Sequence, residues 1–112
     1  MPVVKLTTVG RKSGEKRTVM LTSPHRDGDT IAIVASKGGD PQHPAWFLNL
    51  QANPTVEVET KGQPRRTMTA RVATADERAL LWPTITKTYT MYADYQTKTE
   101  REIPVVLLAP AP

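Results

Sequence analysis

Short β-branched runs separated by tight turns dominate the first 72 residues, and this pattern constrains the fold more than any other feature. Residues 3–9 and 16–23 flank a glycine-containing turn, and Asp27-Gly28-Asp29 leads into a third run over residues 30–35. Residues 56–59 alternate apolar and charged side chains, and a turn at Gly62 leads into residues 66–72. Such runs are typical of antiparallel strands joined by hairpins. Residues 104–108 predict a sixth, buried strand.

Two helical segments interrupt the strands. Residues 44–52 begin with proline, which suits the first position of a helix, and end before Pro54. Thr74-Ala75-Asp76-Glu77 is a capping box, and Pro83 must kink or restart the helix that it begins, with helical character to about Thr97. Six strands, a short helix after the third and a helical segment before the sixth predict a small closed barrel with helical caps.

Composition excludes several classes of chemistry. With 112 residues the chain forms one domain, residues 1–112, and without cysteine it has no disulfide, thiolate metal site or cysteine nucleophile. His25 and His43 stand alone, so we expect no metal site, and no serine lies in a G-x-S-x-G turn. A net charge of +4 favours an acidic ligand, anionic lipid or nucleic acid. No apolar stretch approaches the ~18–20 residues of a membrane span.

Two glycine-flanked basic turns predict a site for an anion. Gly10-Arg11-Lys12-Ser13-Gly14 and Ser36-Lys37-Gly38-Gly39 each follow an apolar strand, and the second leads into the helix that starts at Pro44. Such turns expose backbone N–H groups beside full positive charges, which suits a phosphate or a carboxylate. A plain basic hairpin is the alternative for either turn taken alone.

Aromatic residues gather in the C-terminal third. Trp82, Tyr89, Tyr92 and Tyr95 fall within fourteen positions, and the tyrosines recur every three residues, so they lie on one side of a helix. Two interpretations stay open: a half-buried packing face, or the wall of a pocket for a flat, weakly polar molecule. The other aromatic residues, Trp46 and Phe47, could pack on a planar ligand.

Several ordered motifs resemble the deazaflavin (coenzyme F420)-dependent nitroreductase family, over essentially the whole chain. They are Leu6-Thr7-Thr8-Val9-Gly10-Arg11-Lys12-Ser13-Gly14, Ala35-Ser36-Lys37-Gly38-Gly39, the run from Pro44 to Pro54, Trp82-Pro83 with the spaced tyrosines, and Ile103-Pro104-Val105-Val106. The resemblance implies a split β-barrel related to flavin reductases and pyridoxamine-phosphate oxidases. It also implies the actinobacterial cofactor F420 and hydride transfer from its reduced form to a quinone or a nitroaromatic acceptor, including nitroimidazoles.

The resemblance also assigns site residues by position. The cofactor phosphate and acidic tail would contact Arg11, Lys12 and Ser13, and the same groove would be lined by Arg17, Thr18, Val19, Met20, Leu21 and Thr22. The deazaflavin ring would be bordered by Val34, Ala35, Ser36 and Lys37 and covered by Ala45, Trp46, Phe47, Leu48 and Asn49. The acceptor pocket would be formed by Ser36, Tyr89, Tyr92 and Tyr95. No catalytic side chain is implied, since the cofactor supplies the hydride.

Three departures from the family leave the acceptor and nitroimidazole activation open. Val19-Met20-Leu21-Thr22 stands where relatives often have Asn-Pro-Leu and an aromatic residue, and Ala45 replaces a commonly larger residue. Many relatives have an N-terminal leader that can cover the acceptor site or touch a membrane, and we expect this segment to be missing from the sequence given. We therefore expect a cytoplasmic monomer or homodimer, associated with the inner face of the membrane only through such a leader.

Three other functions compete with this one. A split-barrel reductase that uses FMN would also need a phosphate site, and a non-catalytic F420-binding protein would need the same groove. A barrel that binds single-stranded nucleic acid would carry aromatic residues on its strands, and the predicted strands have none, so we expect no nucleic-acid partner.

Overall fold

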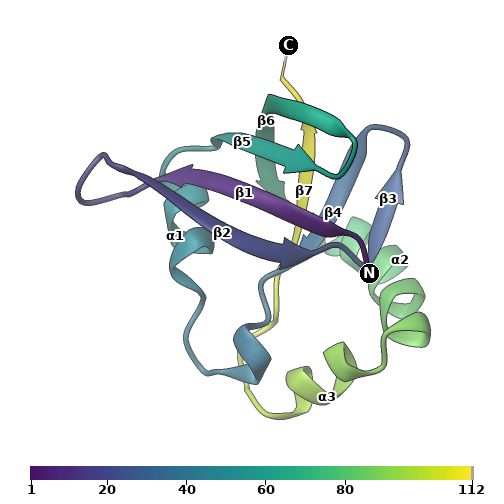
Figure 1. The fold of residues 1–112 in the computed structure, drawn as a ribbon. Helices are drawn as coiled ribbons and strands as arrows, with labels where there is room; N and C mark the ends of the chain where they lie inside the picture. Colours follow the sequence, from purple (N-terminus) through teal and green to yellow (C-terminus); the bar gives the residue numbers. More distant parts are fainter. Residues whose placement is uncertain (112) are drawn as a thin grey trace.

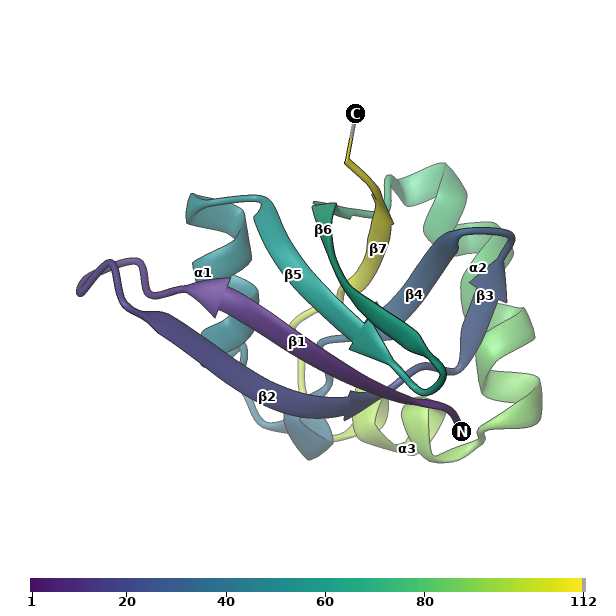
Figure 2. The same ribbon diagram turned by 45° about the horizontal axis from the view of Figure 1, so that its top comes forward.

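The computed structural model describes residues 1–111, in which seven strands form one antiparallel sheet in the order β2-β1-β5-β6-β7-β4-β3. The strands are β1 (Val3–Val9), β2 (Lys16–Thr22), β3 (His25–Asp27), β4 (Thr30–Val34), β5 (Thr55–Thr60), β6 (Gln63–Val72) and β7 (Val105–Pro110). A 3₁₀ turn, η1 (Lys37–Gly39), and three helices, α1 (Ala45–Ala52), α2 (Ala75–Thr88) and α3 (Met91–Thr97), complete the fold. The sheet curls, and the β1–β2 hairpin projects from it (Figures 1 and 2).

The main core lies inside the curl because alternate residues of the strands point inward. Val4 and Leu6 of β1 and Val56 and Val58 of β5 are at most 2% exposed, and they pack with residues of β4, β6 and β7. Helix α1 closes one side of this core with Trp46, Phe47 and Leu50. Its position beside the β1–β2 hairpin is visible in Figure 1.

Strands β4 and β7 are buried on both faces. Their outer residues form a second apolar cluster with α2, α3 and the segment before β7, which comprises Ala32, Val34, Ala73, Ile85, Tyr92, Ile103, Val105 and Leu107. This explains why residues 103–108 are a continuous apolar run instead of an alternating one. The second cluster holds α2 and α3 against the outside of the sheet.

The barrel is split, since β2 and β3 are the two edges of the sheet. Ser23 connects the regions beside these edges: its N–H donates to the Pro2 carbonyl at 2.9 Å, and its hydroxyl bonds to the carbonyls of Ala32 and His25 at 2.6 and 2.9 Å. A gap remains along β2, between the hairpin and the segment that follows β4. The candidate site lies along this strand.

The predicted fold class, a split β-barrel with helices, is confirmed. The closed barrel expected from the strand pattern is wrong, because β2 and β3 are edges of the sheet, and three further details differ. The chain forms an additional short strand, β3, before the predicted turn at Gly28, whose φ is +59°. Pro44 caps α1 instead of starting it, because its ψ of 150° is extended. Helix α2 runs through Pro83 to Thr88, with Tyr89 as its C-cap, so the helix does not restart at Pro83 and the break before α3 comes later.

Within residues 1–111, none of the helices has both the length and the apolar character needed to cross a bilayer.

Candidate functional site

The β1–β2 turn holds two basic side chains at its exposed tip. The Gly10 N–H donates to the Glu15 carbonyl at 2.7 Å, and the Gly14 N–H donates to the Gly10 carbonyl at 2.9 Å. A Cβ at Gly10 would lie 2.7 Å from Ser13 Oγ, so a larger residue would require the Ser13 side chain to move. The tight turn therefore leaves Arg11 and Lys12 exposed to solvent.

Asn49 of α1 anchors this turn to the body of the protein. Its Oδ1 accepts hydrogen bonds from the Arg11 guanidinium at 2.9 Å and from the Arg11 backbone N–H at 3.2 Å. Asn49 is only 4% exposed, whereas Arg11 is exposed. One face of Arg11 is thus used for structure, and its remaining N–H groups face solvent beside Lys12.

The first cavity, which we call the turn cavity, has a volume of roughly 400 Å³ and lies between the β1–β2 turn and α1. It is lined by Gly10, Arg11, Lys12, Ser13, Arg17, Thr18, Val19, Ala45, Trp46 and Asn49. Three of these residues are cationic, and Glu15, which pairs with Arg17 at 3.5 Å, is the nearby counter-charge. The predicted phosphate-binding residues therefore come together in one place.

The second cavity, the loop cavity, lies at the other end of β2 and consists of two overlapping hollows of roughly 330 and 360 Å³. Both hollows are lined by Leu21, Thr22, Val34, Ser36 and Tyr92. Val3 and Met20 extend one hollow, and the other is extended by Lys37, Gly38, Pro44, Trp46, Met91 and Tyr95. Most of this lining is apolar or aromatic.

The two cavities meet at Trp46, which lines both. Strand β2 runs alongside them, with Arg17, Thr18 and Val19 at the turn cavity and Met20, Leu21 and Thr22 at the loop cavity. We call the combined feature the β2 groove. It has cations at one end and apolar and aromatic surface at the other.

The structure separates the three tyrosines that were predicted to share a pocket. Tyr92 and Tyr95 of α3 line the loop cavity, and their rings pack edge to face with centroids 6.1 Å apart. Tyr89, which follows α2, lines a different hollow of roughly 520 Å³ beside Met1, Pro2 and His25. Burial raises the pKa of Tyr92, so its hydroxyl stays protonated near neutral pH. Tyr92 is buried, as the packing interpretation predicts, and it also lines the cavity, while its contact with a flat ligand stays a prediction.

Three other residues predicted to contact the cofactor do not line the β2 groove. Ala35 is fully buried in the main core, and Phe47 is 2% exposed and lies against the His43 ring in a tilted arrangement, with ring centroids 4.7 Å apart. Leu48 is partly buried and packs against the same core. Any effect of these residues on a ligand would be transmitted through the residues that they support.

Sequence reasoning missed Arg101, which lies between α3 and β7. Its guanidinium donates to the carbonyls of Asp40, Ser36 and Ala35 at 2.8, 2.9 and 3.2 Å. The same group lies 3.1 Å from His43 Nδ1. A single arginine before a buried strand carries no signal of such a role, because its partners are main-chain carbonyls about 60 residues away.

His43 is neutral in this arrangement. Arginine can only donate, so the Nδ1 atom that faces Arg101 must be the unprotonated, accepting nitrogen. Burial and, to a smaller extent, the Arg101 charge lower the pKa of His43 below its ordinary value. His43 lies directly before Pro44, the N-cap of α1, and supports the loop through Arg101.

The β2 groove is suited to binding an elongated ligand with an anionic tail and a planar head. In the described part of the chain, no three His, Asp or Glu side chains are arranged to hold a metal ion. The cations of the turn cavity can neutralise phosphate or carboxylate groups, and the apolar lining of the loop cavity can cover a ring.

Comparisons with known proteins agree on one family. Residues 1–110 match the family described as F420H(2)-dependent quinone reductase. An F420H(2)-dependent quinone reductase of Mycobacterium tuberculosis is 44% identical over 110 residues, covering 96% of this chain and 72% of that protein.

Solved structures agree with the sequence match. A structure of an F420-H2 dependent reductase, FDR-A, is 47% identical, has a TM-score of 0.81, and is matched over 96% of this chain and 93% of its own. A FAD-binding protein of Mesorhizobium loti shares 13% identity at a TM-score of 0.69, with 100% of this chain and 83% of that chain covered. The latter likeness supports the split-barrel fold alone.

Proposed function

The chain belongs to the F420H(2)-dependent quinone reductase family and is an F420-dependent reductase, and from this premise we propose that it binds the cofactor along the β2 groove and reduces a quinone there. The observation that carries the proposal is that two neighbouring cavities of complementary character lie along β2. Trp46 lines both the cavity with three cations and the cavity with a mostly apolar and aromatic lining.

The turn cavity would hold the phosphate and the acidic tail of F420. Lys12 and Arg17 are exposed and free to reorient, and Arg11 keeps guanidinium N–H groups that Asn49 does not use. Ser13 adds a hydroxyl at the same turn. Charge-assisted hydrogen bonds from such groups are about twice as strong as neutral ones.

The loop cavity would hold the deazaflavin ring between β2 and the segment after β4. Leu21 and Val34 supply apolar contact, and Ser36 and Lys37 bring polar groups to the rim. F420, once bound and reduced, supplies the hydride, so the groove has to orient the ring and exclude water around it. These residues fit that task without a nucleophile or a general base.

The acceptor would lie against the ring beside Ser36, Tyr92 and Tyr95. The protonated Tyr92 hydroxyl can donate a hydrogen bond to a quinone oxygen or a nitro oxygen. A quinone is the acceptor we propose first, and a nitroaromatic or nitroimidazole compound is the second. Tyr89 faces the separate hollow, so we propose that it contributes least to the acceptor.

A parallel titration with F420 and FMN tests the proposal against the other flavin-type cofactor. We expect micromolar or tighter binding of F420, and weaker binding of FMN, because the three cations suit a longer acidic tail. Equal or tighter binding of FMN in a fluorescence titration would contradict the cofactor assignment. Turnover of a short-chain quinone with reduced F420 then separates an enzyme from a protein that only binds the cofactor.

A further inference from the structure

Arg101 holds the loop that forms one wall of the loop cavity. Its guanidinium reaches three carbonyls in the 35–40 loop and Nδ1 of His43, at distances between 2.8 and 3.2 Å. Arg101 is itself partly buried, and burial lowers its pKa while Asp40 opposes this effect. One side chain therefore binds both ends of the loop that carries Ser36, Lys37 and Gly38 to the cavity.

The loop needs such an external support because its backbone is in an unfavourable conformation. Lys37, Gly38 and Gly39 have consecutive positive φ angles of 44°, 63° and 85°. The first is costly because side chains other than glycine rarely adopt it. Within the loop, the Gly39 N–H donates to the Ser36 carbonyl at 2.9 Å and the Asp40 N–H donates to the Lys37 carbonyl at 3.1 Å.

The same loop packs closely on α3. A Cβ at Gly39 would lie 2.6 Å from the Tyr95 carbonyl oxygen and 2.9 Å from Lys98 Cβ, so this contact requires glycine. Figure 1 shows the 3₁₀ turn beside α3. The loop and α3 thus form adjoining walls of the loop cavity that are in contact at Gly39.

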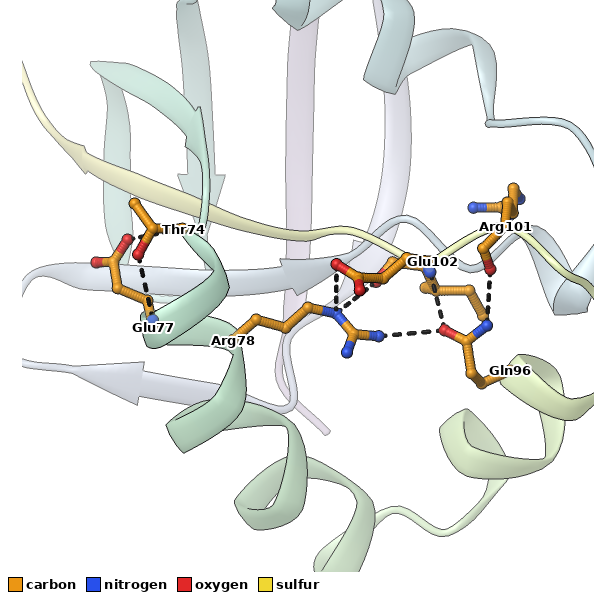
Figure 3. Close-up of polar contacts among 7 residues, drawn as sticks. Thr74, Glu77, Arg78, Gln96, Arg101 and Glu102 are labelled. Carbon is orange, nitrogen blue, oxygen red and sulfur yellow. Dashed lines mark hydrogen bonds and ion pairs between the residues drawn. The ribbon is translucent and has the colours of Figure 1, made fainter.

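Arg101 is anchored to α3 through its own backbone. Gln96 donates from Nε2 to the Arg101 carbonyl at 2.7 Å, and its Oε1 accepts from the Ile103 N–H at 2.9 Å and from Arg78 at 3.1 Å (Figure 3). The backbone of Arg101 is therefore fixed on the α3 side, while its guanidinium holds the loop. Arg101 connects the two walls.

We propose that Arg101 is a positioning residue that sets the spacing between the 35–40 loop and α3, and so the shape of the loop cavity. Its consequence for the ligand rests on the proposed function, in which that cavity holds the deazaflavin ring and the acceptor. Arginine suits the task because its planar fork of five donors can serve several carbonyls at once. Lysine would keep the charge but supply a single ammonium.

Arg78 provides a matched control for a purely structural role. It too is a partly buried arginine, with a side chain 16% exposed, and it donates to the Ile103 carbonyl and to Gln96 at 3.1 Å each. It also pairs with Glu102 at 3.6 Å, and its hydrogen bonds run to the 96–103 segment instead of the 35–40 loop (Figure 3). Arg78 shares Gln96 with Arg101, but Gln96 keeps its own hydrogen bonds to the Arg101 carbonyl and the Ile103 N–H. Loss of Arg78 should therefore reduce stability and affect the loop less than loss of Arg101 does.

The test compares Arg101→Lys, Arg101→Gln and Arg78→Gln by amide hydrogen exchange in the protein without ligand. We expect faster exchange of the Gly39 and Asp40 amides in both Arg101 variants, and a clearly smaller increase in Arg78→Gln. F420 should bind about tenfold more weakly to Arg101→Lys, and the KM for a quinone should rise, because misplaced walls lose ring and acceptor contacts. If Arg101→Gln does not fold, Arg101→Lys carries the test.

Two results would overturn the proposal. One is wild-type exchange and affinity in a folded Arg101→Lys protein; the other is an equal effect of Arg78→Gln on the loop amides, which would indicate general destabilisation. The exchange experiment contains no F420, so it decides the role of Arg101 even if the wild-type protein fails to bind the cofactor. That failure would refute the proposed function separately.

Discussion

Asn49 Oδ1 accepts two hydrogen bonds from Arg11, one from the guanidinium and one from the backbone N–H. Asn49 also donates from Nδ2 to Thr8 Oγ1 at 3.3 Å. A single buried amide of α1 therefore fixes the end of β1 and the exposed turn that follows it. The basic end of the β2 groove depends on this contact for its position.

Replacing Asn49 should affect both stability and the cofactor. Asn49→Ala leaves Thr8 without its side-chain partner and releases Arg11, so we expect a loss of about 1–3 kcal/mol in the free energy of unfolding. Asn49→Asp keeps an acceptor for Arg11 but places a negative charge at the turn cavity. It should therefore bind F420 more weakly than Asn49→Ala does, measured by fluorescence titration beside denaturant unfolding. The reverse order of affinities would contradict an anion site at this end.

Lys12→Ala should weaken F420 binding by about tenfold, because a charge-assisted hydrogen bond to the phosphate or acidic tail is lost. The difference should shrink as salt is raised, since Lys12 is exposed and its interactions are screened. Lys87→Ala is the control: it removes the same charge from the last turn of α2, where no residue lines the groove. Normal affinity of Lys12→Ala at low salt would place the phosphate elsewhere.

The tyrosine variants should differ from one another. Tyr95→Ala should raise the KM for a quinone while F420 affinity changes little, because Tyr95 lines the outer part of the loop cavity. Tyr92→Ala should do the same and also lower stability by about 3–5 kcal/mol, as expected for a large buried side chain. Tyr89→Ala should change acceptor kinetics least. Steady-state kinetics and thermal melts on all three decide the matter, and a dominant kinetic effect of Tyr89 would refute this division.

The capping box of α2 allows a prediction about stability alone. Thr74 accepts from the Glu77 N–H at 3.2 Å, and Glu77 accepts from the Thr74 N–H at 2.9 Å (Figure 3). Thr74→Ala should cost about 1 kcal/mol in the free energy of unfolding. Thr84→Ala, in the middle of the same helix, is the matched control and should be neutral or slightly stabilising, since alanine favours helix. Equal losses in the two variants would contradict a specific cap.

Much of the fold was predictable because local signals agree with tertiary structure in this chain. The predicted hairpin at residues 3–9 and 16–23 corresponds to β1 and β2, and the capping residues of α2 lie where the sequence put them. β3 was missed because three residues next to a glycine turn are too few for a periodic pattern. The sequence predicted a kink or a restart of the helix at Pro83. Proline removes only one N–H from the helix, however, and the packing of Ile85 in the second cluster keeps α2 continuous.

The candidate site was predictable in parts. The turn cavity follows from a basic glycine turn, which is local in sequence. The curl of the strands buries Ala35 and Phe47, and no local pattern in the sequence shows this. The end of α2 separates Tyr89 from Tyr92, and a spacing of three residues does not determine where that helix ends. The role of Arg101 could not be predicted from the sequence, because its partners are carbonyls that only the folded chain brings together.

Low pH should lower the stability of the folded protein, because it protonates His43, which supports the loop. The folded protein holds His43 neutral, with a pKa below the ordinary 6.5, because burial and the Arg101 charge disfavour the imidazolium. The unfolded chain then binds more protons at low pH, so this contribution to stability is complete above about pH 6.5 and is lost as the pH falls through the lowered pKa. Asp40 is the acidic group that faces Arg101, and Phe47 covers the other side of the His43 ring. His43→Gln keeps a polar side chain that does not titrate, so its melting temperature should fall less between pH 7.5 and pH 5 than that of the wild type. Identical pH profiles for the two proteins would show that protonation of His43 does not oppose folding.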